Sequence, residues 1–121
     1  MKEPVISIID DDAATRLALA ALMHAKGFQT KTYESAEAFL QSEAAPSCQC
    51  IITDIFMPGL TGLELKQRLD TERCQVPVIM ITARVDRSLP ALALDSGAFC
   101  FLRKPFKANA LIECVEKALA V

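Results

Sequence analysis

The chain has 121 residues, the size of one domain, and a chain of this length buries enough surface to fold without disulfides or structural metals. Its 52% hydrophobic and 23% charged residues exclude intrinsic disorder. The net charge of −2 argues against a domain that grips nucleic acid through its phosphates, and no apolar run approaches the ~18 residues of a membrane span.

Cysteine usage and the N-terminal residues bear on the compartment. The first apolar run is short and ends at three aspartates, so it does not resemble a signal peptide. The five cysteines are odd in number and scattered, which does not suit a disulfide framework. Cys48 and Cys50 flank one residue, but no second Cys or His pair stands at metal-ligand spacing. We therefore expect free thiols in a cytoplasmic protein.

The first predicted elements are a buried strand and a helix. The β-branched run over 5–9 predicts the strand, which stops at Asp10. Asp12 is the expected N-cap of the helix, and Gly27 ends it. The core stripe of this helix is predicted at Thr15, Leu19, Leu22 and Met23.

A second strand and helix are predicted next, and then a third strand. The strands cover 29–33 and 50–53, and the latter ends at Asp54. Ser35 caps the helix between them, and 44–47 forms a loop.

Proline and glycine mark the loop at 57–59. Thr61 then caps a helix, and Glu64 completes a capping box. A fourth strand is predicted over 76–81, followed by Thr82.

The last predicted elements are a short helix, a strand and a longer helix. The residues 88–90 open the short helix, in which Pro90 fits only the first turn, and Gly97 closes it. The strand covers 98–102, and the final helix covers 106–119.

Five strands alternating with five helices predict a parallel sheet with helices on both faces. We expect one α/β domain over 1–121 with a flavodoxin-like (βα)5 doubly wound fold and strand order 2-1-3-4-5. Any C-terminal output domain would lie outside this chain.

Chemistry-bearing residues follow the predicted strands, where ligands bind in such sheets. They are Asp10, Asp11, Asp54, Thr82 and Lys104. Two carboxylates ~5 Å apart repel by about 3 kcal/mol at an effective dielectric near 20, so three of them need compensation. Lys104 offsets part of the repulsion and a hard divalent cation offsets more. One aspartate could then act as a nucleophile toward phosphorus.

Each of these residues, taken singly, also has an ordinary structural explanation as a helix cap, a strand terminator or a solvated loop residue. Their occurrence at successive strand ends favours a shared site.

The chain resembles a two-component response regulator receiver domain over essentially its whole length. The resemblance lies in Ile8-Ile9-Asp10-Asp11-Asp12, Thr53-Asp54-Ile55-Phe56-Met57-Pro58-Gly59 with Gly62, Ile81-Thr82-Ala83 and Phe101-Leu102-Arg103-Lys104-Pro105-Phe106. Further segments resemble the FixJ-like branch, whose receivers usually precede a LuxR-type helix-turn-helix domain. They are Gly27-Phe28, Tyr33-Glu34-Ser35-Ala36-Glu37-Ala38-Phe39-Leu40 and Gly97-Ala98-x-x-Phe101.

The resemblance implies a phosphoacceptor signalling domain rather than a conventional enzyme. Asp54 would accept the phosphoryl group from a sensor histidine kinase, and Lys104 would pair with that group. Thr82 and the Ala83 amide would bind the phosphoryl oxygens.

The resemblance also implies a metal site and a cis peptide. Asp10, Asp11, Asp54 and the backbone carbonyl of Phe56 would hold Mg²⁺ or Mn²⁺, while Asp12 would be a cap. The Lys104-Pro105 bond is a candidate cis peptide.

A switch is implied in which Thr82 moves toward the phosphoryl group and Phe101 enters the space it leaves. The output surface would comprise the helix opened at 88–90, the strand 98–102 and the helix 106–119. Leu89, Leu92 and Leu94 make that first helix apolar on more than one face, which suggests a homodimer or partner interface. The output would be transcription, with no direct nucleic-acid contact by this domain.

Three other functions compete with this interpretation. A haloacid dehalogenase-like hydrolase would use Asp10 and Asp12 as its D-x-D motif, but the chain is too short for a cap domain. A phosphate-independent interaction domain leaves the complete set of acids, threonine and lysine unexplained. A flavodoxin would need a phosphate-cradling loop where this chain carries acids.

Overall fold

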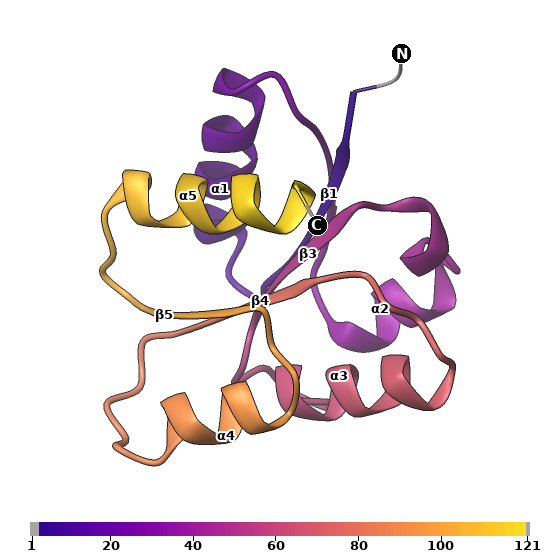
Figure 1. Ribbon diagram of the computed structural model, residues 1–121, viewed down its shortest axis with the longest axis vertical. Coiled ribbons are helices and arrows are strands. Elements are labelled where there is room, and N and C mark those ends of the chain that lie inside the picture. The colour runs from indigo at the N-terminus through magenta and orange to yellow at the C-terminus, as the bar shows by residue number, and fades with distance from the viewer. Residues whose placement is uncertain (1–2, 121) are drawn as a thin grey trace.

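The β-branched and apolar runs form a parallel sheet, as the computed structural model shows for residues 3–120 (Figure 1). Its strands are β1 (Val5–Ile9), β2 (Gln29–Tyr33), β3 (Cys50–Asp54), β4 (Val78–Thr82) and β5 (Cys100–Arg103). All four pairings are parallel and the order is β2-β1-β3-β4-β5, which confirms the predicted fold class. Of the predicted domain 1–121, Met1, Lys2 and Val121 lie outside the described residues.

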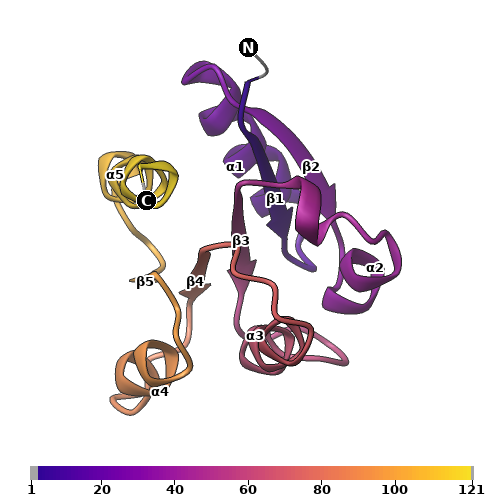
Figure 2. The same cartoon turned by 45° about the vertical axis from the view of Figure 1, so that its right-hand side comes forward.

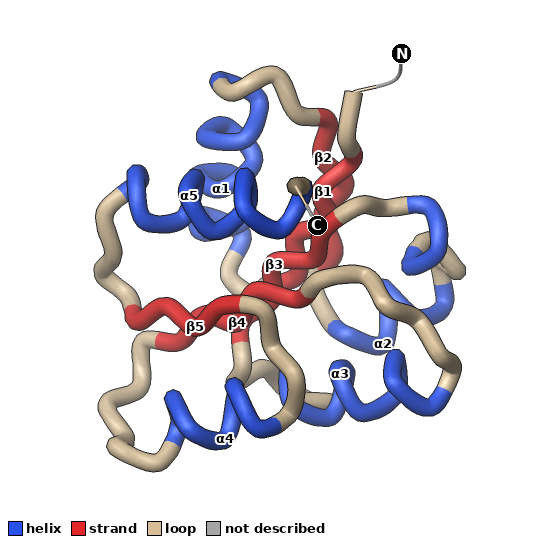
Figure 3. Tube along the Cα trace, viewed as in Figure 1, coloured by secondary structure: helices blue, strands red, loops and turns tan. Residues whose placement is uncertain are grey.

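Helices cover both faces of the sheet, as expected for right-handed crossovers between parallel strands. They are α1 (Ala13–Ala25), α2 (Ala36–Gln41), α3 (Gly62–Thr71), α4 (Leu89–Asp95) and α5 (Ala108–Leu119), with a 3₁₀ turn η1 (Ala45–Ser47) before β3. Helices α1 and α5 lie on one face, and α2, α3 and α4 lie on the other (Figures 2 and 3). No helix within residues 3–120 is long and apolar enough to cross a bilayer.

Two hydrophobic clusters fill the space between these layers. One lies under α1 and α5, and the other under α2, α3 and α4. Every residue of β3 and β4 is buried, whereas β5 is half-buried to exposed. The site-bearing ends of β3 and β4 are therefore anchored in the best-packed part of the molecule.

Three of the predicted helix starts are confirmed by their caps. The Asp12 side chain accepts a hydrogen bond from the Thr15 backbone N–H, and Ser35 accepts one from Ala38. Thr61 and Glu64 form the reciprocal capping box at the start of α3.

Three predicted starts were wrong, each by two residues. β4 begins at Val78 rather than at residue 76, and Pro77 contributes only its carbonyl, which accepts from the Ile51 N–H. β5 begins at Cys100 rather than at residue 98, because the Ala98 N–H is bonded to Ala93 at the end of α4.

The third error concerns α5, which begins at Ala108 rather than at residue 106. Lys107 has extended backbone (φ −76°, ψ 142°) and stands as its N-cap.

The cysteines are free thiols, as predicted. Cys48 and Cys50 are buried, and the other three are half-buried. Burial raises the pKa of the Cys50 thiol to about 12, so this thiol stays protonated and acts as a small apolar side chain.

Candidate functional site

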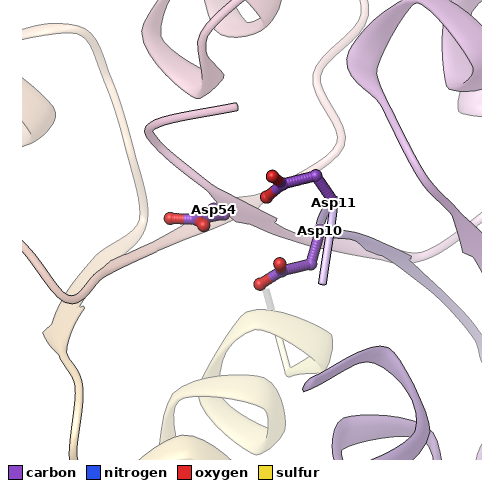
Figure 4. A group of neighbouring side chains, drawn as sticks. All are labelled: Asp10, Asp11 and Asp54. Carbon is purple, nitrogen blue, oxygen red and sulfur yellow. The ribbon is translucent and has the colours of Figure 1, made fainter. Parts of the chain in front are cut away.

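Three carboxylates meet at the carboxyl ends of β1 and β3. Asp10 and Asp11 follow β1 and Asp54 ends β3, and one oxygen from each lies within 4.8 Å of the others (Figure 4). Asp10 is fully buried, Asp54 is 9% exposed and Asp11 is open to solvent. The pairing of β1 with β3 holds the strand ends in register, so the folded sheet itself brings these like charges together.

Lys104 supplies the positive charge beside these acids. Its Nζ lies 3.1 Å from Asp10 Oδ2 and 3.8 Å from Asp54 Oδ2. The Lys104 backbone N–H donates to the Thr82 carbonyl at 2.7 Å, which ties the loop after β5 to the end of β4. The Lys104-Pro105 peptide is cis, as predicted.

The Asp54 carboxyl is electrostatically unusual. Its pKa is raised to about 6: burial is the main cause and the neighbouring Asp10 adds to it, while Lys104 acts in the opposite direction. Ordinary aspartate in water titrates near pH 4. Burial deprives the ionised carboxylate of hydration, which raises its free energy. A cation bound at the site, or an electrophile bonded to the carboxylate, would lower that free energy.

Thr82 and Ala83 lie beside Asp54 at the end of β4. Thr82 is buried, and its Oγ1 accepts a hydrogen bond from the Arg84 N–H at 3.1 Å. The β3–β4 pairing sets Asp54 opposite Ile81, so the threonine is one residue beyond the acid along the sheet. Ala83 is exposed at the start of the loop that follows.

Phe101 lies on β5, opposite Met80 of β4. Its side chain is half-buried and packs against the cluster under α2, α3 and α4. Thr82 and Phe101 therefore occupy adjacent strands.

Phe56 and Arg84 form a pair above the strand ends. Phe56 is half-buried in the loop after β3, and the Arg84 guanidinium carbon lies 3.7 Å from the centre of its ring. This is cation–π geometry, which attracts a guanidinium to an aromatic face. The spacing of these two residues along the sequence does not indicate that they touch.

Arg16 was missed by the sequence analysis. Its Nη1 donates to the Asp10 backbone carbonyl at 2.7 Å from the second turn of α1. A second hydrogen bond, from the Asp12 N–H to Asp10 Oδ1 at 2.9 Å, also holds the turn that carries Asp10, Asp11 and Asp12. No sequence pattern could have signalled the contact, because Asp10 precedes α1 and a backbone carbonyl leaves no mark in the sequence.

The acidic cluster has the donor chemistry of a hard-cation site. Mg²⁺ and Mn²⁺ prefer carboxylate and carbonyl oxygens, and Asp10, Asp11 and Asp54 offer oxygens close enough to share one ion. The cluster combines a buried and an exposed acid, so an ion there could keep water or phosphate oxygens as further ligands. Asp12 is outside the cluster because its carboxylate caps α1.

An apolar groove runs from Lys104 along α1. It is lined by Ala14, Thr15, Ala18, Leu19, Leu22, Lys104, Pro105, Phe106 and Ala108. The groove therefore borders Lys104 and lies beside the site.

Comparison with known proteins gives a consistent family match. Residues 6–116 match the model of the response regulator receiver domain. The transcriptional regulatory protein FixJ of Bradyrhizobium diazoefficiens is 37% identical over 114 residues, which cover 94% of this chain and 56% of that protein. The response regulator protein TmoT of Ectopseudomonas mendocina is 36% identical over 98% of this chain and 54% of its own length.

The structural comparison agrees. The crystal structure of FixJ-N superposes with a TM-score of 0.88 at 34% identity, covering 99% of this chain and 96% of that one. The chain spans about half the length of the curated relatives it matches.

Proposed function

This chain belongs to the response regulator receiver family, and we propose from that premise that Asp54 accepts a phosphoryl group from a sensor histidine kinase. The observation that carries the proposal is the position of Asp54: buried, at a strand end, within 4.8 Å of two other carboxylates and 3.8 Å from the Lys104 ammonium. In the reaction an Asp54 carboxylate oxygen forms the new bond to phosphorus, and the bond from phosphorus to the donor imidazole breaks.

The residues around Asp54 would each stabilise part of the negative charge on the transferred phosphoryl group. Lys104, already beside Asp10 and Asp54, would pair with the phosphoryl oxygens. Thr82 Oγ1 and the Ala83 amide would donate to those oxygens once the loop after β4 moves inward. Mg²⁺ or Mn²⁺, held by Asp10, Asp11, Asp54 and the Phe56 carbonyl, would neutralise charge on the transferring group.

An apolar surface beside Lys104 supports a protein as the phosphoryl donor. The groove along α1 suits the apolar face of a kinase helix that presents a phosphohistidine. Receivers meet such kinases in the cytoplasm, where the free cysteines of this chain would also stay reduced.

The response would pass through Thr82 and Phe101. A phosphoryl group adds about −1.5 to −2 charge at Asp54. If Thr82 moves toward it, the half-buried Phe101 can shift into the space left behind, and this biases a two-state surface formed by α4, β5 and α5. Leu92 and Leu94 of α4 are 48% and 56% exposed, so this surface can bury apolar area against a second copy.

The output is proposed to be transcriptional. FixJ is named as a transcriptional regulatory protein, and this chain covers 56% of its length. In this proposal the domain over 1–121 receives the signal and makes no nucleic-acid contact itself, in keeping with its net charge of −2.

The hydrolase alternative loses support at Asp12. A D-x-D mechanism needs Asp10 and Asp12 to face one substrate, but Asp12 Oδ2 accepts from the Thr15 N–H and hydroxyl at the start of α1.

The test is the intact mass of the protein after incubation with acetyl phosphate, with and without Mg²⁺, for the parent and for Asp54→Asn. We expect one Mg²⁺-dependent phosphoryl adduct in the parent and none in the variant. An adduct that survives in Asp54→Asn would shift the nucleophile to another carboxylate, with Asp10 first. The absence of any adduct with acetyl phosphate and with a phosphorylated kinase would contradict the proposal.

A further inference from the structure

A carboxylate from α2 holds the loop that connects β3 to α3. Glu37 Oε2 accepts a hydrogen bond from the Leu60 backbone N–H at 3.1 Å, across 23 residues of sequence. Helix α2 lies beside α3 in both cartoon views, so the contact bridges two adjacent parts of one face of the sheet (Figures 1 and 2). Glu37 belongs to one of the segments that resemble the FixJ-like branch, yet neither the acidic cluster nor the switch uses it.

Gly59 makes room for this carboxylate. Its φ is +82°, and a Cβ built on it would lie 2.1 Å from Glu37 Oε2. Glycine at position 59 suits the left-handed backbone, and any side chain there would push the Glu37 carboxylate away from its place.

The second oxygen of Glu37 makes the arrangement costly. Oε1 is buried and has no hydrogen-bond partner among the described residues. A buried carboxylate oxygen without a partner loses hydration and regains nothing for it. Folding stability alone therefore does not favour a carboxylate here, which points to a role in placing the loop.

The other end of the same loop is equally constrained. The Gly62 N–H donates to the Ile55 carbonyl at 2.7 Å, and a Cβ on Gly62 would lie 2.6 Å from the Asp54 carbonyl oxygen. Phe56 lies between this closure and the Glu37 contact, so its position depends on both.

We propose that Glu37 is a positioning residue for the phosphoacceptor site. By holding the Leu60 amide next to Gly59, it sets where the Phe56 carbonyl lies relative to Asp54. The inference rests on the proposed function, in which that carbonyl is a ligand of the divalent cation.

The first measurement is the Mg²⁺ dissociation constant by isothermal titration calorimetry, with far-UV circular dichroism to check folding. Glu37→Ala should weaken Mg²⁺ binding about tenfold, as loss of a residue that orients a metal ligand typically does. Glu37→Gln should stay close to the parent, because its amide oxygen can accept the same hydrogen bond. Glu34→Ala, an exposed glutamate in the same segment, is the matched control and should leave binding unchanged.

The second measurement is amide hydrogen exchange without metal. Glu37→Ala should speed exchange at Leu60 and leave the amides of β3 and β4 unchanged. Unchanged exchange at Leu60 would overturn the contact. Faster exchange with unchanged Mg²⁺ affinity would reduce Glu37 to a structural residue and overturn the positioning role. If the parent binds no Mg²⁺ but Glu37→Ala still speeds exchange at Leu60, then the metal site of the proposed function is rejected, and the positioning role is rejected with it.

A double-mutant cycle completes the test. Gly59→Ala should impair Mg²⁺ binding in the parent, and it should impair it less in the Glu37→Ala background, where the carboxylate no longer obstructs the new methyl group. Purely additive losses would contradict the proposed contact.

Discussion

At Asp54, burial and the nearby charge of Asp10 both disfavour the ionised carboxylate when no cation is bound. It is buried beside Asp10, and its pKa of about 6 exceeds the value of 3.8 for an ordinary aspartate. The folded protein holds this proton more tightly than the unfolded chain does. The contribution of Asp54 to the free energy of unfolding is therefore greatest below about pH 4, falls as the pH rises and reaches its lowest value above about pH 6.

Asp54→Asn should consequently stabilise the metal-free protein at pH 7.5. A shift of about two pKa units corresponds to about 1–3 kcal/mol, and asparagine keeps the shape without the charge. Urea denaturation in EDTA measures the gain, which should fade as the pH is lowered toward 4. Asp11→Asn, at an exposed acid of the same cluster, is the control and should gain less. Equal stability of Asp54→Asn and parent at pH 7.5 would contradict the interpretation.

Phe56→Ala should speed hydrolysis of the aspartyl phosphate several-fold. We predict that the Phe56 ring, with the Arg84 guanidinium stacked on it, limits the approach of water to Asp54, so that removing the ring removes this stacked pair. The rate of phosphate release after removal of the phosphoryl donor gives the answer. Phe56→Leu, which keeps bulk but loses the stacking, should fall between the two. A variant that loses phosphate no faster than the parent would refute the shielding role.

Residues at strand ends were predictable, whereas contacts between loops were not. The positions of Asp10, Asp54 and Thr82 follow from strand-end patterns and parallel topology. The stacking of Arg84 on Phe56 joins two loops, and the bond from Leu60 to Glu37 joins a loop to α2, so both depend on how separate segments pack together. Neither periodicity nor spacing encodes such contacts.

At the scale of elements, short capping motifs in the sequence predicted where helices begin better than the apolar runs predicted where strands begin. The Thr61 capping box is contained within four consecutive residues, so the sequence could reveal it. The limits of β4 and β5 depend on which backbone groups find partners across the sheet, as at Pro77 and Ala98.

Thr61→Ala should destabilise the protein by about 1 kcal/mol, because α3 loses the acceptor for the Glu64 N–H. Urea denaturation should show a lower midpoint with an unchanged slope. Thr71→Ala, at the exposed other end of α3, serves as the comparison and should change stability less. Equal losses for both variants would mean that the capping box contributes little.

At the scale of the whole molecule, two exposed leucines, Leu92 and Leu94, lie together on α4. If phosphorylation creates a dimer through α4, β5 and α5, the combined Leu92→Ala and Leu94→Ala variant should weaken that dimer at least tenfold. Light scattering of phosphorylated and unphosphorylated protein measures the mass. Leu17→Ala, at a leucine that is 73% exposed on α1, should leave dimerisation unchanged. A monomer in both phosphorylation states would exclude the dimer.

The strands differ in burial: β3 and β4 are fully buried, whereas β5 is half-buried to exposed. Thr82 ends a strand that is packed on both faces and paired on both sides, whereas Phe101 lies on an outermost strand with β4 as its single neighbour. A displacement of β5 disturbs one ladder of hydrogen bonds and little fully buried surface. In the proposed switch, a shift of β5 would therefore leave the carboxylates in register, at a free-energy cost set by one half-buried strand.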